Sequence, residues 1–381
     1  MSAATPTPRD AGLPPPPVPT SSSLSIDSAR TPPNVNKPTI LHLGGDIRWN
    51  HELYAELGRR FNVERSYSMG RQDFKRALKE NKWGNFVGIY RPFWNTGGEM
   101  GNWDEELISL LPPSCRIYAS AGAGFDWVDT RTLARRGIIY CNSASACTES
   151  VVDIAIVLIL STYRAIPWSF LAARSCNPAE FRNANQNIAA VTHNPNGTIL
   201  GIVGLGKIGH RLAQKASLAF EMEIWYHDIA RMEEREKSLP GGAKWCEKLE
   251  DLFQNADCVV LCTPFDGSVL LSTTQFSQFK TGARLVNIAR GKLVDEIALI
   301  AALDEGKISA AGLDVHSNEP NVNKDLAQRM NVMVTSHTAG ASVESHIGFE
   351  RLGIENLLGW SERGRDGVVT AVNLRWLVGS E

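Results

Sequence analysis

The chain has 381 residues, with 39 lysines and arginines against 41 aspartates and glutamates, and a formal net charge of −2 at pH 7. This length exceeds what one hydrophobic core usually serves, so two domains are expected. The balanced charge offers no basic excess for nucleic acid or a membrane surface, and the seven cysteines lack metal-site or disulfide-framework spacing. We therefore expect a cytoplasmic protein that binds no metal, nucleic acid or membrane.

The first 37 residues are rich in Pro, Ser and Thr and include four consecutive prolines at 14–17. Such a composition cannot bury enough apolar surface to fold, which predicts a disordered tail. The segment has neither the positive start nor the long apolar centre of a secretory signal.

Residues 38–147 alternate short apolar runs with helical stretches, which is an α/β pattern and is expected to form the first part of a substrate domain. The candidate strands are residues 40–43, 86–90 and 116–119, and a helix is expected at 50–61.

A long helix is expected at about 148–163. Its apolar run, residues 151–160, is interrupted by Asp153 and is shorter than the ~20 residues of a bilayer span, so it predicts a buried helix. An irregular stretch containing Pro167, Pro178 and Pro195 should follow.

Residues 198–228 carry the most informative pattern in the chain. A branched apolar strand at 199–203 leads into G-L-G-K-I-G at 204–209, a helix to about residue 220, and a second strand at 223–227 that ends at Asp228. In a dinucleotide fingerprint the first glycine allows a tight turn, the second allows close approach of the pyrophosphate, and the third allows close packing of helix on strand. The phosphates would lie at the helix N-terminus.

Asp228 also bears on the choice of cofactor. A carboxylate at this position can accept both ribose hydroxyls of NAD and repels the 2′-phosphate of NADP. Arg231 lies three residues further on, so NADP is disfavoured but stays open.

Strands recur at 258–262, 284–288, 309–313 and 332–335 with helices between them, which predicts a doubly wound parallel sheet over residues 148–339. Residues 340–381 should form a last helix that returns to the first domain.

Four candidate reactive residues follow these strands: Arg290, Asp314, Glu319 and His337. In open α/β sheets such groups gather at the carboxyl ends of the strands. Hydride transfer to a ketone needs a proton donor, which a histidine supplies, and a neighbouring carboxylate stabilises the protonated imidazole. A guanidinium suits a substrate carboxylate. Taken singly, these residue types also have purely structural explanations: an Arg that caps a helix, a solvated Glu and a hydrogen-bonded His in a loop.

The segments N-I-A-R-G at 287–291, D-V-H-S-N-E-P at 314–320 and S-H-T-A-G at 336–340 resemble the motifs of the D-isomer-specific 2-hydroxyacid dehydrogenases in order and spacing. Within that family the chain is most similar to the fungal D-mandelate dehydrogenases, through S-A-G-A-G-F-D-W at 120–127, H-N-P-N-G at 193–197 and the run at 313–322. The resemblance implies a Rossmann-type doubly wound sheet inserted into a smaller flavodoxin-like α/β substrate domain. It also implies a homodimer, with the segment after residue 148 as hinge and dimer arm.

The resemblance assigns roles to the candidates. Arg290 would bind the substrate carboxylate, Glu319 would support His337, and His337 would exchange the proton. Asp314 would face the nicotinamide carboxamide. The implied cofactor contacts are Gly204, Leu205, Gly206, Lys207, Ile208, Gly209, Asp228, Thr263, Pro264, Ile288, Ala289, Asp314 and Gly340.

The substrate side of the site is expected in the first domain. Backbone N–H groups of Ala123 and Gly124 could form a nest for the carboxylate, although an ordinary turn is the alternative. The segment 90–94, which ends at Trp94, either lines an apolar pocket or packs in the core. Three residues depart from the pattern of the wider family and bear on the expected substrate range. Trp127 stands where the family often has Asn, and Val152 and Asp153 stand where it often has Ala and Glu.

We therefore predict an NAD-dependent D-2-hydroxyacid dehydrogenase that acts on a bulky or aromatic 2-oxo acid such as benzoylformate, phenylpyruvate or a branched-chain oxo acid. The alternatives are a glyoxylate or hydroxypyruvate reductase, and an NAD(H)-sensing protein similar to the C-terminal-binding-protein corepressors, which the Pro-rich tail would favour. Formate dehydrogenase is argued against by Glu319, because that enzyme lacks a Glu partner for its His.

Overall fold

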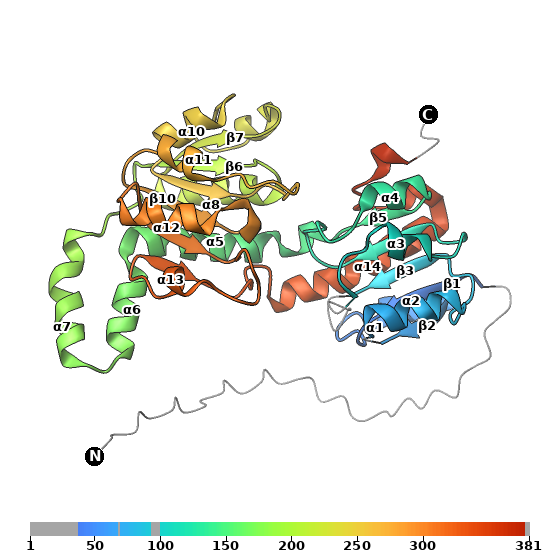
Figure 1. Ribbon diagram of the computed structural model, residues 1–381. Coiled ribbons are helices and arrows are strands. Elements are labelled where there is room, and N and C mark those ends of the chain that lie inside the picture. Colours follow the sequence, from blue (N-terminus) through green and yellow to red (C-terminus); the bar gives the residue numbers. More distant parts are fainter. Residues whose placement is uncertain (1–36, 68, 93–99, 378–381) are drawn as a thin grey trace, which may run out of the picture. The chain divides into compact units, whose positions relative to one another are not determined.

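The computed structural model describes residues 37–67, 69–92 and 100–377, so the predicted disordered tail and Trp94 lie outside the described residues. The described chain contains two parallel sheets, each flanked by helices (Figure 1). The predicted fold class, a two-domain α/β protein, is confirmed.

The first sheet has five strands in the order β2-β1-β3-β4-β5, the flavodoxin-like order. Its strands are β1 Thr39–Leu43, β2 Asn62–Ser66, β3 Gly88–Arg91, β4 Ile117–Ser120 and β5 Ile139–Cys141. Its helices are α1 His51–Arg60, α2 Arg71–Lys79, α3 Glu105–Ser109 and α4 Thr130–Arg135.

The second sheet has seven parallel strands in the order β12-β11-β10-β9-β6-β7-β8. The strands are β6 Ile199–Val203, β7 Glu223–His227, β8 Lys244–Trp245, β9 Cys258–Leu261, β10 Ala283–Asn287, β11 Ile308–Leu313 and β12 Val332–Val334. The helices are α8 Lys207–Phe220, α9 Glu233–Lys237, α10 Leu249–Asn255, α11 Thr273–Gln278, α12 Glu296–Asp304 and α13 Lys324–Ala327. The strand order reverses between β6 and β9, and ligands of open α/β sheets bind at such a switch point.

Three strands escaped the sequence-based prediction, and all three are edge strands. β2 reads N-V-E-R-S, β5 has three residues and β8 has two. Edge strands are commonly short or polar, so hydropathy marks them poorly.

The prediction of an irregular stretch after residue 163 was wrong for residues 166–187. These residues fold into two helices, α6 Ile166–Arg174 and α7 Pro178–Asn187, and both begin with a proline in the first turn. Proline is tolerated there because the N–H that it lacks has no partner within the helix, so Pro167 and Pro178 start helices and do not interrupt them.

Helix α5, Thr148–Arg164, continues the 3₁₀ turn at Ala144–Cys147. The turn and the helix together span 21 residues, which is long and apolar enough by composition to cross a membrane. The apolar run predicted at 151–160 was too short for that. Core helices of soluble proteins pass the same test. Val152, Ala155 and Leu158 are fully buried in the core of the second sheet, as expected of a buried helix.

The last helix, α14 Val343–Arg363, packs against the first sheet. The buried carboxylate of Glu350 accepts hydrogen bonds from the backbone N–H groups of Arg48, Trp49 and Asn50 at 2.6–3.1 Å. The amide of Asn50, which precedes α1, donates to the same carboxylate at 3.1 Å. Glu350 thus pairs the backbone donors of the three residues that lead into α1, from 300–302 positions further along the chain.

We expect Glu350→Ala to lower the free energy of unfolding by about 2 kcal/mol, since it leaves several partly buried donors unpaired. Glu344→Ala, which removes an exposed carboxylate from the same helix, is the matched control. Urea unfolding of both variants measures the difference. Equal stabilities of the two variants would contradict the role given to Glu350.

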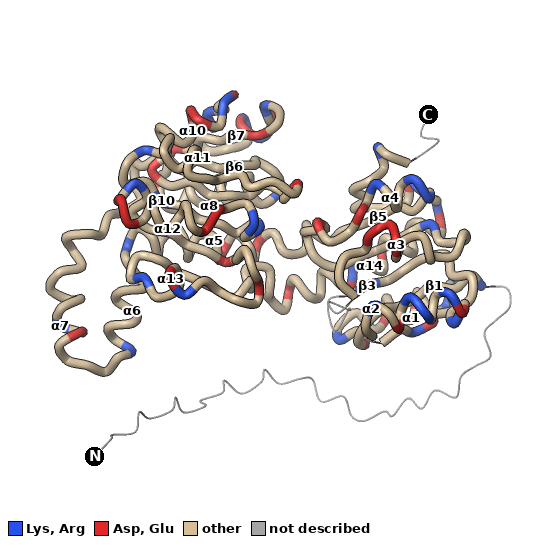
Figure 2. Tube along the Cα trace, in the orientation of Figure 1, with Lys and Arg blue, Asp and Glu red and all other residues tan. Residues whose placement is uncertain are grey.

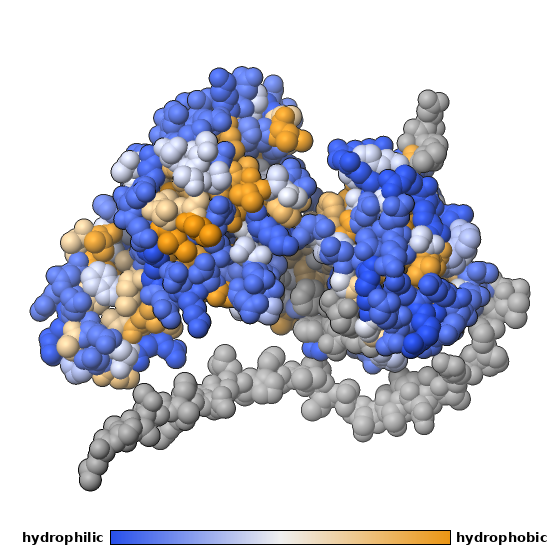
Figure 3. Space-filling view, viewed as in Figure 1, coloured by the Kyte–Doolittle hydropathy of each residue, from blue (hydrophilic) through white to orange (hydrophobic). Residues whose placement is uncertain are grey.

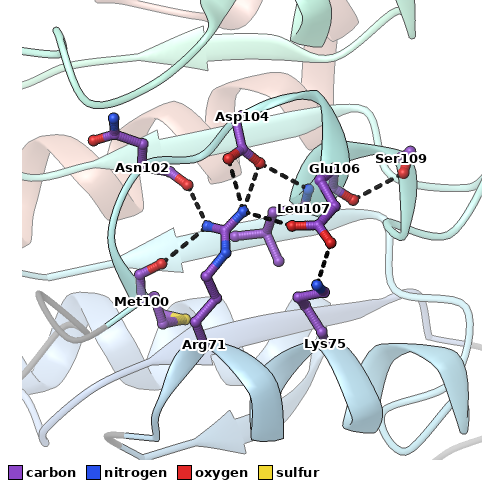
Figure 4. Close-up of polar contacts among 8 residues, drawn as sticks. All are labelled: Arg71, Lys75, Met100, Asn102, Asp104, Glu106, Leu107 and Ser109. Atoms are coloured by element: carbon purple, nitrogen blue, oxygen red, sulfur yellow. Dashed lines mark hydrogen bonds and ion pairs between the residues drawn. The ribbon is translucent and has the colours of Figure 1, made fainter.

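A network of ion pairs ties α2 to the segment before α3 (Figure 4). The guanidinium of Arg71 donates to the carbonyls of Met100 and Asn102 at 3.1 and 2.6 Å and forms an ion pair with Asp104 at 2.7 Å. Between Asn102 and Asp104, the backbone N–H of Trp103 donates to the carbonyl of Trp127 at 2.8 Å. This network holds the segment 100–104 beside residues 127–129, which follow the loop that carries Gly124.

Candidate active site

The glycine-rich turn joins β6 to α8. Gly204 has φ +95°, and a Cβ added there would lie 3.0 Å from the carbonyl oxygen of Cys262, at the end of β9. A Cβ at Gly209 would lie 2.1 Å from the oxygen of Gly204, so α8 packs directly on the turn. Both positions therefore require glycine.

The N-terminus of α8 fits a dinucleotide phosphate. No side chain caps this helix, and a Cβ added at Gly206 would meet nothing within 4 Å. The first-turn N–H groups, including those of Lys207 and Ile208, thus lie beside open space where a pyrophosphate can approach.

Asp228 follows β7, beside this turn. Its carboxylate accepts the N–H of Leu205 at 2.8 Å and that of Ile229 at 2.8 Å. Each carboxylate oxygen has more than one acceptor site, so these bonds leave room for ribose hydroxyls.

His337 and Glu319 form the expected pair. Nδ1 of His337 lies 2.8 Å from Oε2 of Glu319 and donates to it, which leaves Nε2 for a substrate. The N–H of His316 donates to the other oxygen of Glu319 at 2.9 Å. Partial burial acts to raise the pKa of Glu319, but the hydrogen bonds from His337 and His316 outweigh it, so the pKa is lowered and the carboxylate is ionised at neutral pH.

Asp314 is buried and serves the loop that carries His337. Its carboxylate accepts hydrogen bonds from Thr335 Oγ1, from the N–H of Thr338 and from the N–H of Ala339 at 2.6–3.0 Å. Its backbone carbonyl accepts the N–H of His337 at 2.8 Å. These bonds hold His337 at φ +54°, a left-handed conformation that is strained for a residue with a side chain.

Arg290 follows β10 and reaches the loop that carries Gly124. Its Nε donates to Asp126 Oδ1 at 2.8 Å and its Nη1 donates to the carbonyl of Ala289 at 2.7 Å. A Cβ added at Gly124 would lie 1.2 Å from Nη2, so the guanidinium rests directly on the glycine backbone. The structure thus brings together Arg290 and the nest predicted at Ala123 and Gly124.

One close packing contact joins the loop of Arg290 to the loop of Glu319. A Cβ at Gly291 would lie 1.9 Å from the carbonyl carbon of His316, whose N–H binds Glu319. His316 in turn lies 2.9 Å from the carbonyl of Thr335 through Nε2. The loops that carry the three predicted catalytic residues are therefore in contact.

The remaining predicted cofactor residues lie around the same strand ends. Thr263 and Pro264 follow β9, and Ile288 and Ala289 follow β10. Gly340 contacts the start of α5: a Cβ there would lie 3.6 Å from that of Cys147.

The substrate side differs in part from expectation. Tyr90 is fully buried and donates to the backbone carbonyl of Glu350 at 3.2 Å, so it belongs to the core and not to a pocket. Trp127 is stacked by the guanidinium of Arg91 at 4.2 Å. Asp126 was missed by the sequence reasoning, although its place two residues after the nest, in A-G-F-D, could have suggested a partner for Arg290.

Residues 156–339 match the family model of the D-isomer specific 2-hydroxyacid dehydrogenase NAD binding domain. The chain is 32% identical to 4-methyl-2-oxopentanoate reductase A of Aspergillus oryzae over 326 residues, which is 84% of this chain and 94% of the relative. The chain belongs to the D-isomer-specific 2-hydroxyacid dehydrogenase family.

Solved structures of the family agree. Apo D-mandelate dehydrogenase of Rhodotorula graminis superimposes with a TM-score of 0.83 at 37% identity, covering 88% of this chain and 98% of that one. NADPH-dependent glyoxylate/hydroxypyruvate reductase of Sinorhizobium meliloti superimposes with a TM-score of 0.69 at 29% identity, covering 88% and 97%. The family thus supplies the reaction class, 2-hydroxyacid oxidation and 2-oxo acid reduction with a nicotinamide cofactor, while its members differ in substrate.

Proposed function

We propose that this protein is an NAD-dependent D-2-hydroxyacid dehydrogenase that reduces a bulky or aromatic 2-oxo acid. The observation that carries the proposal is the pair formed by His337 and Glu319 at 2.8 Å, in contact through His316 with the loop of Arg290. A paired imidazole, together with a guanidinium on a contacting loop, is what reduction of a keto acid needs.

In this proposal the residues from Gly204 to Gly209, with Asp228, hold the dinucleotide, and the bound nicotinamide supplies or accepts the hydride. Arg290 and the N–H groups of Ala123 and Gly124 hold the substrate carboxylate. His337 gives its Nε2 proton to the keto oxygen during reduction, and in the neutral form it takes the hydroxyl proton during oxidation. Glu319 binds Nδ1–H throughout, which fixes the ring and stabilises its protonated form.

Two relatives support a bulky substrate, since their names refer to a branched-chain 2-oxo acid and to mandelate. Glyoxylate/hydroxypyruvate reductases also match, which favours small substrates as the second candidate. The corepressor alternative depends on the tail, which lies outside the described residues. The relatives are named for dehydrogenase and reductase activity, so we place the enzyme first.

The test is a reduction panel of benzoylformate, phenylpyruvate, 4-methyl-2-oxopentanoate, hydroxypyruvate and glyoxylate, each with NADH and with NADPH, followed at 340 nm. We expect the highest kcat/KM with a bulky acid and NADH. A preference for glyoxylate would move the assignment to the small-substrate reductases. Tight NADH binding without turnover of any acid would overturn the enzyme assignment.

We also propose a homodimer that forms through α6, α7 and the adjoining face of α5. Helices α6 and α7 carry few charged residues (Figure 2), and apolar residues are exposed on them among polar ones (Figure 3). The large apolar residues that are at least 40% exposed are Val157, Ile166, Phe170, Leu171 and Phe181 on the three helices, and Val191 after α7. Elsewhere on the described chain acidic and basic residues are interspersed (Figure 2).

We expect the double variant Phe170→Glu, Phe181→Glu to run as a monomer in light scattering at concentrations where the parent protein is a dimer. Charged groups cannot be buried in an apolar interface without a partner. Val269→Glu, at an exposed apolar residue outside these three helices, is the control. A dimeric double variant would refute this interface.

The domain limits at residues 38–147, 148–339 and 340–381 and the cytoplasmic location stay predictions. The contacts of α14 with the first sheet support the proposed return of the C-terminal segment.

A further inference from the structure

The segment after β7 contains an arginine that is held by a buried carboxylate. Nε of Arg231 lies 3.0 and 3.2 Å from the two oxygens of Glu236, and Nη2 lies 3.0 Å from Oε2. The side chain of Glu236 is only 10% exposed, whereas that of Arg231 is 53% exposed. The pair is bidentate, the geometry that orients a guanidinium most firmly.

A second buried group fixes Glu236 in place. The hydroxyl of Tyr226, on β7, donates to Oε1 of Glu236 at 2.5 Å and accepts the N–H of Met232 at 2.8 Å. Tyr226 is itself fully buried. The carboxylate therefore cannot follow Arg231 if the arginine turns towards a ligand, and the arginine must leave the pair to do so.

This segment lies against the glycine-rich turn. The N–H of Leu205 donates to Asp228, and the carbonyl of the same residue accepts a hydrogen bond from Arg235 on α9. Arg231 and Glu236 belong to the stretch between Asp228 and the end of α9, so they border the place where the fingerprint puts the adenosine ribose.

An arginine near this ribose is the usual partner of an NADP 2′-phosphate, and an acidic residue at the end of the second strand is the usual partner of the NAD hydroxyls. This chain has both, in Asp228 and Arg231. The two would give opposite preferences if Arg231 were free to reach the phosphate.

We propose that Glu236 is a cofactor-specificity residue, which holds Arg231 in an ion pair and so withholds it from the 2′-phosphate of NADPH. The proposal rests on the proposed nicotinamide site, but it adds that the preference for NAD depends on a residue that does not touch the cofactor. Asp228 disfavours the phosphate directly, and Glu236 removes the cation that could compensate.

The test is Glu236→Gln, which keeps the size of the side chain and its bond with Tyr226 but removes the charge that retains Arg231. We expect the ratio of NADPH to NADH affinity to rise by about ten- to a hundredfold, the worth of one charge-assisted hydrogen bond. Dissociation constants are measured by quenching of tryptophan fluorescence, and kcat/KM by reduction of the best acid of the panel.

Two further variants make the result specific. Glu234→Gln removes an equal charge from the exposed face of α9 and should leave the ratio near that of the parent. Adding Arg231→Gln to Glu236→Gln should abolish the gain. A ratio in Glu236→Gln equal to that in Glu234→Gln, or a gain that persists without Arg231, would overturn the proposal.

Binding and turnover separate this proposal from the proposed function. If the parent protein binds both dinucleotides but reduces no 2-oxo acid, the enzyme assignment fails while the affinity ratios still decide the role of Glu236. If the variant Arg231→Gln binds NADPH more weakly than the parent protein does, Arg231 already reaches the phosphate in the parent and the proposal is wrong.

Discussion

Replacement of His337 by Asn is expected to lower kcat for 2-oxo acid reduction by about 10²- to 10⁴-fold, the usual contribution of a positioned acid or base. The asparagine amide can still donate to Glu319, which lies 2.8 Å from Nδ1 of the histidine, but it cannot give a proton to the keto oxygen. Steady-state rates with the preferred acid, together with a fluorescence titration of NADH, measure the effect.

The titration separates loss of chemistry from loss of the site. We expect the NADH dissociation constant to change less than threefold, because none of the bonds of the glycine turn involves His337. His193→Asn, at an exposed histidine outside the site, is the control for the substitution itself. Turnover of His337→Asn within a few-fold of the parent would exclude His337 as the acid.

Much of the fold could be predicted because buried parallel strands have a clear hydropathy signature. β6 and β7 were predicted to the residue, since I-L-G-I-V and E-I-W-Y-H are bounded by turns and a helix. The edge strands β2 and β8 could not be predicted, because strands with one open edge need little apolar character. Helices α6 and α7 were missed because proline was read as a break and not as a first-turn residue.

The candidate site divides in a similar way. Arg290, Glu319 and His337 stand in local motifs at strand ends, so their types and order were sufficient to nominate them. Asp126, whose carboxylate is the partner of Arg290, comes from a loop 164 positions away, so only its place beside the predicted nest could have suggested it. The backbone of Gly124 accommodates the guanidinium for a reason that becomes visible only in three dimensions, namely that a Cβ would overlap Nη2.

Arg290→Lys is expected to lower kcat/KM for the 2-oxo acid by about 10²- to 10³-fold, because two charge-assisted hydrogen bonds to the carboxylate are worth roughly 3 to 4 kcal/mol together. Lysine keeps the positive charge but not the fork. In the structure Nε of the guanidinium already donates to Asp126 at 2.8 Å and Nη1 donates to the carbonyl of Ala289 at 2.7 Å, so the N–H groups left for a substrate are those of Nη2 and the second one of Nη1. A single ammonium cannot satisfy these acceptors and a substrate as well.

Asp126→Asn provides the graded comparison. It keeps the guanidinium and weakens only its anchor, so we expect a smaller loss of about tenfold in kcat/KM, the value of one bond to a charged group. Arg329→Lys, at an arginine that pairs with Asp304 on the surface, should have the activity of the parent and serves as the control. If Arg290→Lys loses no more activity than Asp126→Asn, the guanidinium does not bind the substrate carboxylate through its remaining N–H groups. The nest at Ala123 and Gly124 would then have to hold that carboxylate without it.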